Sequence, residues 1–476
     1  MVFSSPLFLA LFLPTLLAAY AAAGNRFRNA VLLAASLLFY AWGEPKAVFL
    51  MLALVLADWL SGLAIGRAMA AGRGRAADVA LAAGVAASLG ALALFKYGSF
   101  ASQNLRLLGI PAPDPGLALP IGISFYVFQC VSYLVDVRRG AVPAERSLPA
   151  FALYVSLFPQ LVAGPIVRYE TVRGALDDRP FRAGDAACGL ARFGRGLAKK
   201  VLLADTLGAV ADAAFAPDLS AVPQAMAWAG LACYALQIFL DFSGYSDMAI
   251  GLGRVFGFRF PENFDHPYCS TSVREFWRRW HMTLSSWFRD YLYIPLGGSH
   301  RGAWRTARNL WIVFALCGLW HGASWCFVAW GLWHGLGLVA GRFLSRGGKA
   351  APARLSAPAA LAGNLGTWLF VLVGWIPFKA GTDGRSLAYA ARYLRLLVAG
   401  NPAVSLSSSR LWADSATAGA AVAFAFALLI SYPGPAARLL PREGSRAFWA
   451  VSFVLFAVAY LFAMTSSYSP FLYFRF

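Results

Sequence analysis

Charged residues are scarce in this sequence, and their scarcity excludes most soluble folds. Only 13% of the 476 residues are charged, whereas 59% are hydrophobic, and soluble domains usually carry about a quarter charged residues. A chain of this composition cannot cover its apolar surface in water. We therefore predict an all-α polytopic membrane protein, with one integral-membrane domain over residues 1–476. Roughly 10–12 helices would cross or half-cross the bilayer, at about 20 apolar residues each.

Acidic residues are the scarcer of the two charge types, with 22 Asp plus Glu against 41 Lys plus Arg. The basic residues form short clusters between apolar runs, and no basic tail or soluble domain accompanies them, so a nucleic-acid partner is not predicted. Basic loops are typical of the cytoplasmic side. Because they fall on every second connection, we expect a multi-pass membrane protein whose N-terminus lies on the outer side of the membrane. The clusters that set this alternation are Arg26 and Arg28, then Arg67, Arg73 and Arg75, then Arg138, Arg139 and Arg146.

Several catalytic and metal-binding motifs are also missing. The six cysteines form no CxxC pair, and the sequence contains no GxSxG elbow, P-loop or HExxH motif. No two of the five histidines stand at i, i+4 on a helix, and no carboxylate clusters with them. We therefore predict neither a metal site nor a bound cofactor.

Long apolar runs dominate what is present. Pro111 to Pro120 and Pro159 to Pro165 interrupt them, and interrupted helices at membrane depth need protein or a water-filled cavity around their freed backbone groups. The polar stretch 170–200 predicts a cytoplasmic loop leading into an interfacial amphipathic helix, and 383–398 predicts a second surface helix. The expected apolar helices lie near 2–23, 30–42, 47–66, 78–98, 119–140, 223–256, 309–341, 358–378, 414–432 and 447–465.

The Trp-rich stretch 273–294 contains the first candidate catalytic residue, His281. Its apolar spacing predicts one amphipathic helix, ending at Pro295, with Trp277, Trp280 and His281 on the same face. On such a helix His281 either faces the bundle interior and contacts substrate, or hydrogen-bonds a backbone carbonyl in a structural role.

His321 is the second candidate, in an apolar segment that spans residues 309–341. If a helix begins near Asn309, His321 lies about 18 Å along it at 1.5 Å per residue, past the middle of a hydrocarbon core about 30 Å thick. The segment is either one strongly tilted helix or a hairpin broken between Gly318 and Gly322. A neutral imidazole at this depth is suited to act as a general base.

Three other ionisable residues lie in apolar sequence. His334, in GLWHG, repeats the pattern of His321 more weakly, and a structural role is the first expectation for it. Asp241 and Asp247, in DFSGYSDM, need partners at membrane depth, so we expect structural pairing with an Arg or with hydroxyl groups.

The runs WRRWHMTLSSWFRDYLYIPLGGS and LWHGASW resemble the membrane-bound O-acyltransferase (MBOAT) superfamily. The opening MVFSSPLFLALFLP, the segment FPQLVAGPIVRY and the run DFSGYSDMAIGLG are similar to its branch that O-acetylates alginate-like polysaccharides. The D-alanyl-transferring branch shares the two histidine motifs but differs in these three segments. The resemblance implies a helical bundle with a central funnel from each face, His321 as the catalytic histidine and His281 as the second one. The motif residues expected to bind or support substrate are Asn263, Trp280, Arg289, Asp290, Trp320 and Ser324, with His334, Asp241 and Asp247.

The resemblance further implies acetyl transfer from cytosolic acetyl-CoA, across the membrane, to a periplasmic acetyltransferase partner that modifies a polysaccharide hydroxyl. The phosphates of acetyl-CoA would meet basic residues at the inner mouth. His321 would act as base or transient acceptor, and His281 would orient the substrate or stabilise charge in the transition state. The alternatives are D-alanyl or other acyl transfer to a cell-wall polymer, and a non-catalytic polysaccharide or acyl transporter. The basic residues expected at the mouth are Arg195, Lys199, Lys200 or Arg305.

Overall fold

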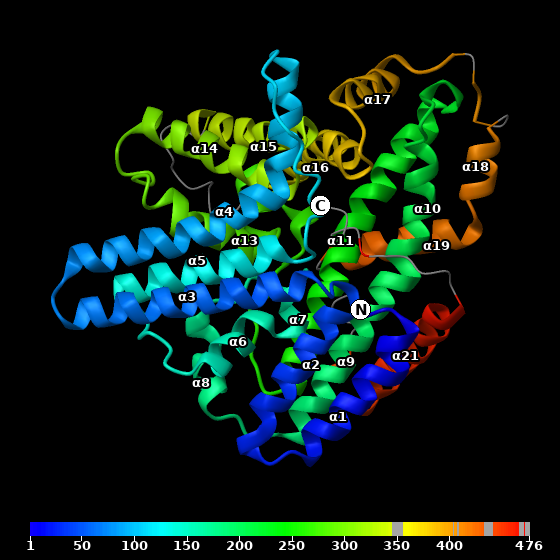
Figure 1. The fold of residues 1–476 in the computed structure, drawn as a ribbon. Helices are drawn as coiled ribbons and strands as arrows, with labels where there is room; N and C mark the ends of the chain where they lie inside the picture. The colour runs from blue at the N-terminus through cyan, green and yellow to red at the C-terminus, as the bar shows by residue number, and fades with distance from the viewer. Residues whose placement is uncertain (345–355, 403, 407–408, 433–440, 466–470, 472–476) are drawn as a thin grey trace. The chain divides into compact units, whose positions relative to one another are not determined.

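The computed structural model describes residues 1–344, 356–402, 404–406, 409–432, 441–465 and 471, and these contain helices and loops but no strand (Figure 1). The chain forms two compact units, which are described separately. The first unit comprises Met1–Gly194, Ser246–Pro261 and Ala463–Tyr468, and the second comprises Arg195–Tyr245, Glu262–Phe462 and Ser469–Phe476. Helices therefore confirm the all-α prediction throughout the part of the chain that is described.

The first unit is built around helices that follow one another closely in sequence. α3, α4 and α5 pack side by side (Figure 1), and α2 packs on α6. The helices are α1 (Leu13–Ala22), α2 (Arg28–Gly43), α3 (Ala47–Ala70), α4 (Gly74–Leu107), α5 (Ile123–Arg139), α6 (Leu148–Ser156), α7 (Phe158–Leu161), α8 (Tyr169–Asp177) and α9 (Ala183–Ala198), whose last turn enters the second unit.

The second unit contains both histidine motifs. Its central pair is α14 and α15, which lie side by side and are followed by α16 against α15 (Figure 1). The helices are α10 (Asp205–Ala214), α11 (Gln224–Val255), whose end enters the first unit, α12 (Val273–Arg279), α13 (Met282–Phe288), α14 (Ala303–His321), α15 (Trp325–Leu344), α16 (Ala357–Thr382), α17 (Leu387–Ala399), α18 (Arg410–Ser415), α19 (Ala418–Ser431) and α21 (Arg446–Thr465).

Six of the described helices are long and apolar enough to cross a membrane: α3, α4, α11, α15, α16 and α21. Two shorter apolar helices cover Phe8–Ala22 and Ala418–Ser431. Large apolar side chains are exposed on these helices, as expected for contact with lipid. Phe49 of α3, for example, is 72% exposed. The sequence predicts roughly 10–12 crossings or half-crossings, about twice the number of these long helices. That number stays a prediction.

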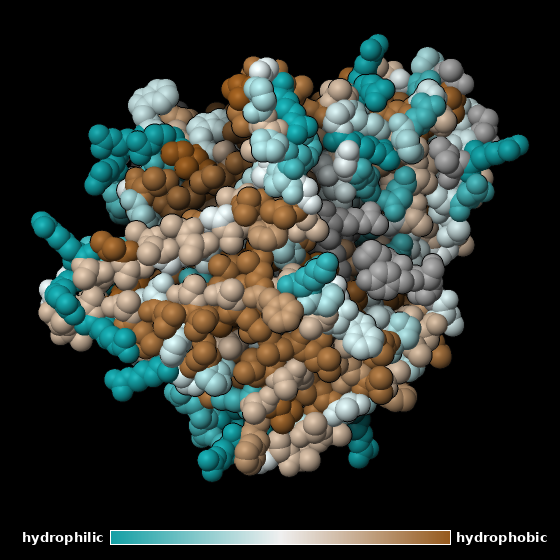
Figure 2. Space-filling view, in the orientation of Figure 1, coloured by the Kyte–Doolittle hydropathy of each residue, from teal (hydrophilic) through white to brown (hydrophobic). Residues whose placement is uncertain are grey.

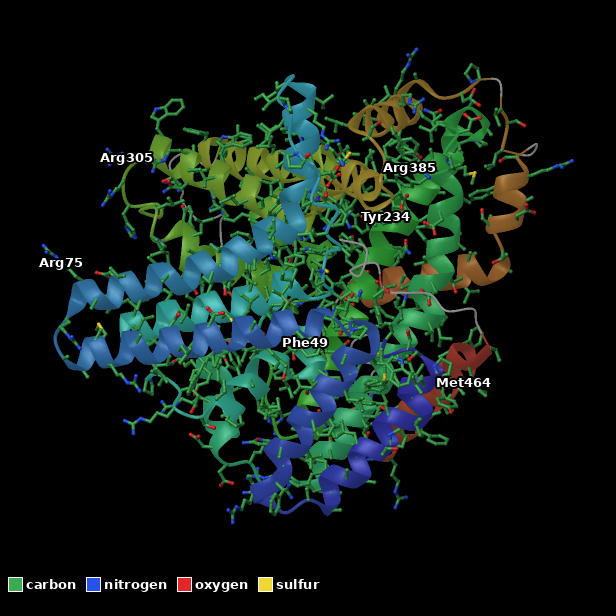
Figure 3. All side chains as sticks on the ribbon, in the orientation of Figure 1. Phe49, Arg75, Tyr234, Arg305, Arg385 and Met464 are labelled. Atoms are coloured by element: carbon green, nitrogen blue, oxygen red, sulfur yellow. The ribbon has the colours of Figure 1, made fainter. Side chains whose placement is uncertain are left out.

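The α3–α4 hairpin shows how charge is separated from apolar surface in the first unit. In Figure 2, hydrophobic side chains spread over the helices of this unit, while hydrophilic side chains gather at the turn between α3 and α4. Arg75 marks that turn and Phe49 lies on α3 (Figure 3). α4 has 34 residues, about 51 Å at 1.5 Å per residue, so it is longer than a hydrocarbon core of about 30 Å requires.

The predicted interruptions are present. The chain leaves the helical conformation between the end of α4 at Leu107 and Ile123, as the proline-rich stretch predicted. Pro159 lies in the four-residue helix α7, and no helix covers residues 162–168. The expected helix at 383–398 is α17, whose first turn is capped by the Ser386 hydroxyl, which accepts from Tyr389 N–H.

The structure decides between the two alternatives for residues 309–341 in favour of a hairpin. α14 ends at His321 and α15 begins at Trp325. The two helices approach so closely that a Cβ on Gly318 would lie 2.3 Å from the Phe327 carbonyl oxygen, and a Cβ on Gly331 would lie 2.2 Å from the Phe314 carbonyl oxygen. Only glycine fits at these two positions.

Candidate functional site

His281 lies at a break in the chain rather than inside a helix. Its φ is 43° and its ψ is 54°, a left-handed conformation that costs a non-glycine residue about 1–2 kcal/mol. Two backbone hydrogen bonds hold this break: Met282 N–H donates to the Asn263 carbonyl oxygen, and Asp265 N–H donates to the Arg279 carbonyl oxygen, each at 2.9 Å. The prediction of one helix over 273–294 is therefore wrong at this point, because the Asn263 loop takes over backbone bonds that a helix would make internally.

The side chain of Asn263 holds the His281 ring. Asn263 Oδ1 lies 3.0 Å from His281 Nδ1, and the same oxygen accepts from Thr283 Oγ1 at 2.9 Å and from Thr283 N–H at 3.4 Å. All three residues are buried. His281 lies outside the candidate membrane spans, and complete burial lowers the pKa of its imidazole below the usual range. The neutral ring is therefore its resting form.

Aromatic rings connect His281 to His321. The Trp320 ring lies 6.0 Å from the His281 ring and 4.9 Å from the His321 ring, centroid to centroid. His321 also packs edge-on against Trp330 at 4.8 Å and Phe378 at 5.1 Å. The structure thus brings two predicted histidines and the predicted Trp320 into one cluster, contributed by α14, α15, α16 and the break before α13.

His321 differs from the other clustered histidines in accessibility. It retains 4% of its surface, whereas His281 and His334 are fully buried at 0%. It is the last residue of α14, which has 19 residues, so it lies about 27 Å from the start of that helix rather than the predicted 18 Å. Carbonyl groups at a helix C-terminus favour a cation there by about 0.3–1 kcal/mol. An imidazole at this position is therefore placed to accept a proton.

His334 lies in the same cluster, and the lone pair on its Nδ1 accepts a hydrogen bond. Trp277 Nε1–H donates to His334 Nδ1 at 3.2 Å, and the Trp330 ring lies 5.0 Å away. Because an indole nitrogen can only donate, the proton of neutral His334 is on Nε2. A buried ring without a free lone pair cannot act as a base, which agrees with the structural role expected from the sequence.

Trp280 and Ser324 have structural contacts of their own. Trp280 stacks on Phe276 at 5.4 Å and packs 5.0 Å from Trp375 of α16. Ser324 Oγ accepts from Cys326 N–H at 3.2 Å, in the first turn of α15. This is the hydrogen bond of a helix N-cap. The position of Ser324 is therefore explained by a structural role as a helix cap, without a role as a nucleophile.

Asp241 is paired away from the histidines. Its Oδ1 lies 2.9 Å from Lys200 Nζ, and Lys200 donates to Asp205 Oδ1 at 2.6 Å. Lys200 and Asp241 are each only 2% exposed. The prediction that Lys200 meets phosphates at the inner mouth is therefore wrong, because a buried cation between two carboxylates is already neutralised. Arg305 is exposed at the start of α14 (Figure 3).

Asp247, Arg289 and Asp290 form ion pairs of their own. Asp247 belongs to the first unit and pairs with Arg192 at 2.8 Å, which is the arginine pairing that the sequence predicted. Arg289 and Asp290 pair with each other at 2.6 Å in the π-helical turn Arg289–Tyr293, where Arg289 is 61% exposed. Whether any of them binds substrate stays a prediction.

Charged residues frame the start of α12. Ser272 caps the helix by accepting from Glu275 N–H, and Glu275 accepts from Thr271 N–H at 2.9 Å and pairs with Arg279 at 3.1 Å. Burial alone would raise the pKa of Glu275, but the bonds from Thr271 and Arg279 outweigh it and hold that pKa below its usual value. Arg279 also pairs with Asp265 at 3.1 Å. These pairs fix the segment that leads into His281.

Sequence reasoning missed the anchor of α16. Lys379, which follows Phe378, is 1% exposed and pairs with Asp212 of α10 at 2.6 Å and with Asp383 at 2.9 Å. Its Nζ lies 5.5 Å from the ring of Tyr234, which Figure 3 labels on α11. The anchor holds Phe378 against His321. The Lys379–Asp383 pair has local i,i+4 spacing, but nothing local in the sequence indicates the contacts with Asp212 of α10 and Tyr234 of α11.

Among the described residues, no group of three or more His, Cys, Asp or Glu side chains is placed to hold a metal ion. The cluster offers two imidazoles with different surroundings. His321 keeps 4% of its surface exposed, and His281 is held by an amide. Such a pair suits the transfer of a proton during attack of a hydroxyl on an acyl group.

Comparison with known proteins identifies the family. Residues 125–376 match the MBOAT, membrane-bound O-acyltransferase family. The chain belongs to this family. The probable alginate O-acetylase AlgI of Pseudomonas putida is 41% identical over 500 residues, covering 100% of both chains. The protein of that name from Pseudomonas aeruginosa is 43% identical over 385 residues, covering 80% of this chain and 72% of that protein.

The name of a further relative refers to a different polymer. The peptidoglycan O-acetyltransferase of Helicobacter pylori is 33% identical over 434 residues, covering 84% of this chain and 80% of that protein. Together with the six candidate spans, the family match makes this chain a multi-pass membrane O-acyltransferase, and it confirms both the resemblance and the fold class predicted from the sequence. The family also implies an acyl donor.

Proposed function

We propose that this protein takes acetyl groups from cytosolic acetyl-CoA and passes them across a bacterial inner membrane for O-acetylation of an alginate-like polysaccharide. The names of the relatives that cover most of the chain support acetyl as the group and alginate as the polymer. The observation that carries the proposal is the position of His321, which ends α14 inside a cluster of aromatic rings and keeps 4% of its surface exposed.

In the proposed reaction, His321 accepts the proton of an acceptor hydroxyl as its oxygen attacks the thioester carbonyl carbon. The C–S bond then breaks, and the proton passes to the sulfur that leaves as coenzyme A thiol. The α14 C-terminus favours the imidazolium that forms. The acceptor hydroxyl belongs to the polymer or to a periplasmic acetyltransferase partner that relays the acetyl group.

The donor and the direction of transfer are tested in proteoliposomes that contain the purified protein, with an alginate oligosaccharide on the face opposite the acetyl-CoA to supply the acceptor hydroxyl. Acetyl-CoA is supplied on one face at a time, and release of the free thiol is measured for the wild type and His321→Gln. His300→Gln is the matched control, because His300 lies in the exposed basic loop before α14. We expect thiol release only from the face that carries Arg305, and only with His321 present. No release from either face, with folded protein, contradicts acetyl-CoA as the donor.

The acceptor is tested in cells of an alginate-producing bacterium that lack their own alginate O-acetylase of this family. Expression of this chain is expected to restore O-acetyl esters on alginate. Restoration of peptidoglycan acetylation instead, in cells that lack that activity, would replace alginate with the polymer of the Helicobacter relative. Pull-down with the alginate acetylation proteins tests the periplasmic partner in the same cells.

A further inference from the structure

The orientation of the Asn263 amide is fixed by its donors. Its Oδ1 accepts from the backbone N–H of Thr283 at 3.4 Å and from Thr283 Oγ1 at 2.9 Å. A backbone N–H can only donate, so the atom facing Thr283 is the amide oxygen and not the nitrogen. The same oxygen lies 3.0 Å from His281 Nδ1. An oxygen cannot donate here, and therefore Nδ1 carries the proton.

A neutral imidazole has one protonated and one unprotonated nitrogen. With the proton on Nδ1, the lone pair of His281 is on Nε2, the nitrogen that faces away from Asn263. His334 has the opposite arrangement, because Trp277 Nε1–H occupies its Nδ1 lone pair. The two fully buried histidines of the cluster are thus held as different tautomers.

We propose that Asn263, oriented by Thr283, is a positioning residue that holds His281 as the Nδ1–H tautomer, so that His281 Nε2 accepts a hydrogen bond from a hydroxyl of the acyl acceptor other than the one whose proton passes to His321. The proposal rests on the proposed acyl transfer. It decides between the two roles expected from the sequence: His281 orients the acceptor and does not donate to an oxyanion. Outer partners of this kind fix the tautomer and orientation of functional histidines in other proteins.

The surroundings of His281 keep this arrangement neutral. Phe242 of α11 packs edge-on at 4.7 Å, Phe264 stacks at 6.4 Å, and Trp320 of α14 lies at 6.0 Å. Of the ionisable groups on the neighbouring turn and loop, Arg279 pairs with Glu275 and with Asp265, and His266 Nδ1 lies 3.2 Å from Asp265. The others on these segments are Glu262, Arg274 and Arg278. The described partner of His281 Nδ1 is an uncharged amide, so nothing among these contacts stabilises an imidazolium at this position.

The first test compares Asn263→Leu with Asn263→Asp in acetyl transfer. Leu cannot accept from Nδ1, and we expect kcat to fall about 10–100-fold, as for other outer-partner losses, with a smaller change in KM. Asp accepts from Nδ1 but stabilises the imidazolium. It should therefore restore most of the activity at high pH, while the acidic limb of the rate profile moves to higher pH, because a raised pKa keeps the ring protonated further up the scale.

Matched variants separate positioning from folding. Asn364 is the control, because its amide bonds the carbonyl oxygens of Tyr268 and Ser270 on the same loop but touches no histidine. We expect Asn364→Leu to lower thermal stability and to leave the pH profile unshifted. Thr283→Val removes one donor to Asn263 and should lower kcat less than Asn263→Leu does, whereas Thr283→Ser should recover it.

The second test does not depend on turnover. Nitrogen-15 NMR of labelled histidine in the purified protein reports which ring nitrogen carries the proton. We expect a neutral Nδ1–H signal for His281 that changes in Asn263→Leu. An Nε2–H signal for His281, or wild-type kcat in folded Asn263→Leu, or an unshifted acidic limb in Asn263→Asp, overturns the proposal. A wild-type protein that shows the Nδ1–H signal but transfers no acetyl group would instead contradict the proposed function.

Discussion

The three clustered histidines differ in the hydrogen-bond partners of their ring nitrogens and in their exposure. His334 has its Nδ1 lone pair occupied by Trp277, His281 is held by Asn263, and His321 keeps some accessible surface. Hydrogen-bond partners and accessibility, rather than depth alone, therefore distinguish their roles. The sequence placed all three in apolar surroundings and ranked His321 first, but it could not show their hydrogen-bond partners, which are 18 residues away for His281 and 57 for His334.

Ser324 gives a prediction at the same scale. Since its hydroxyl caps α15 by accepting from Cys326 N–H, Ser324→Ala should lower the free energy of unfolding by about 1 kcal/mol. Acetyl transfer at low temperature should stay within a few-fold of the wild type. Thermal unfolding in detergent and steady-state kinetics measure the two effects. Complete loss of turnover in folded Ser324→Ala, with recovery in neither Ser324→Thr nor Ser324→Asn, would identify a nucleophile and contradict the cap.

At the scale of elements, the sequence predicted long apolar helices and proline-rich interruptions correctly, because both depend on local composition. It failed where a distant segment supplies the hydrogen bonds. The break at His281 depends on the carbonyl of Asn263, and no property of residues 273–294 alone reveals it. The sequence left the α14–α15 hairpin as one of two alternatives. Its close contact depends on Gly318 and Gly331, and each of them meets backbone atoms of the opposite helix, which the sequence alone does not show.

The hairpin gives the element-scale prediction. A Cβ on Gly331 would lie 2.2 Å from a backbone oxygen that cannot rotate away, so Gly331→Ala should destabilise the protein by about 1–3 kcal/mol or more. Gly341→Ala, on the same helix but facing open space, is the control and should unfold at the wild-type temperature. Thermal unfolding in detergent compares the two variants. Equal unfolding temperatures would show that α14 and α15 are not in the close contact described.

At the scale of the whole molecule, the family, the helical content and the exposed apolar surface agree on a multi-pass membrane enzyme. Orientation in the membrane rests on the alternation of basic loops. The union of both compact units into a single functional domain over residues 1–476 also stays a prediction.

Orientation can be tested at the two ends of α4. Arg75→Cys lies at the basic turn and Gln103→Cys near the far end, and both positions are exposed. If the N-terminus is periplasmic, a membrane-impermeant maleimide should label Gln103→Cys in intact cells whose outer membrane is permeable. It should label Arg75→Cys only after the inner membrane is opened. The reverse pattern would place the basic turn outside and invert the topology. The six native cysteines are replaced by serine or alanine in the background.

The most direct test of the central claim is the turnover number for acetyl transfer by His321→Gln, measured beside His300→Gln in protein of wild-type unfolding temperature. Loss of a general base typically lowers the rate by about 10²–10⁴-fold, and we predict a loss in this range for His321→Gln and wild-type turnover for His300→Gln. Turnover of His321→Gln within about three-fold of the wild type, a loss far below that range, would contradict a catalytic role for His321.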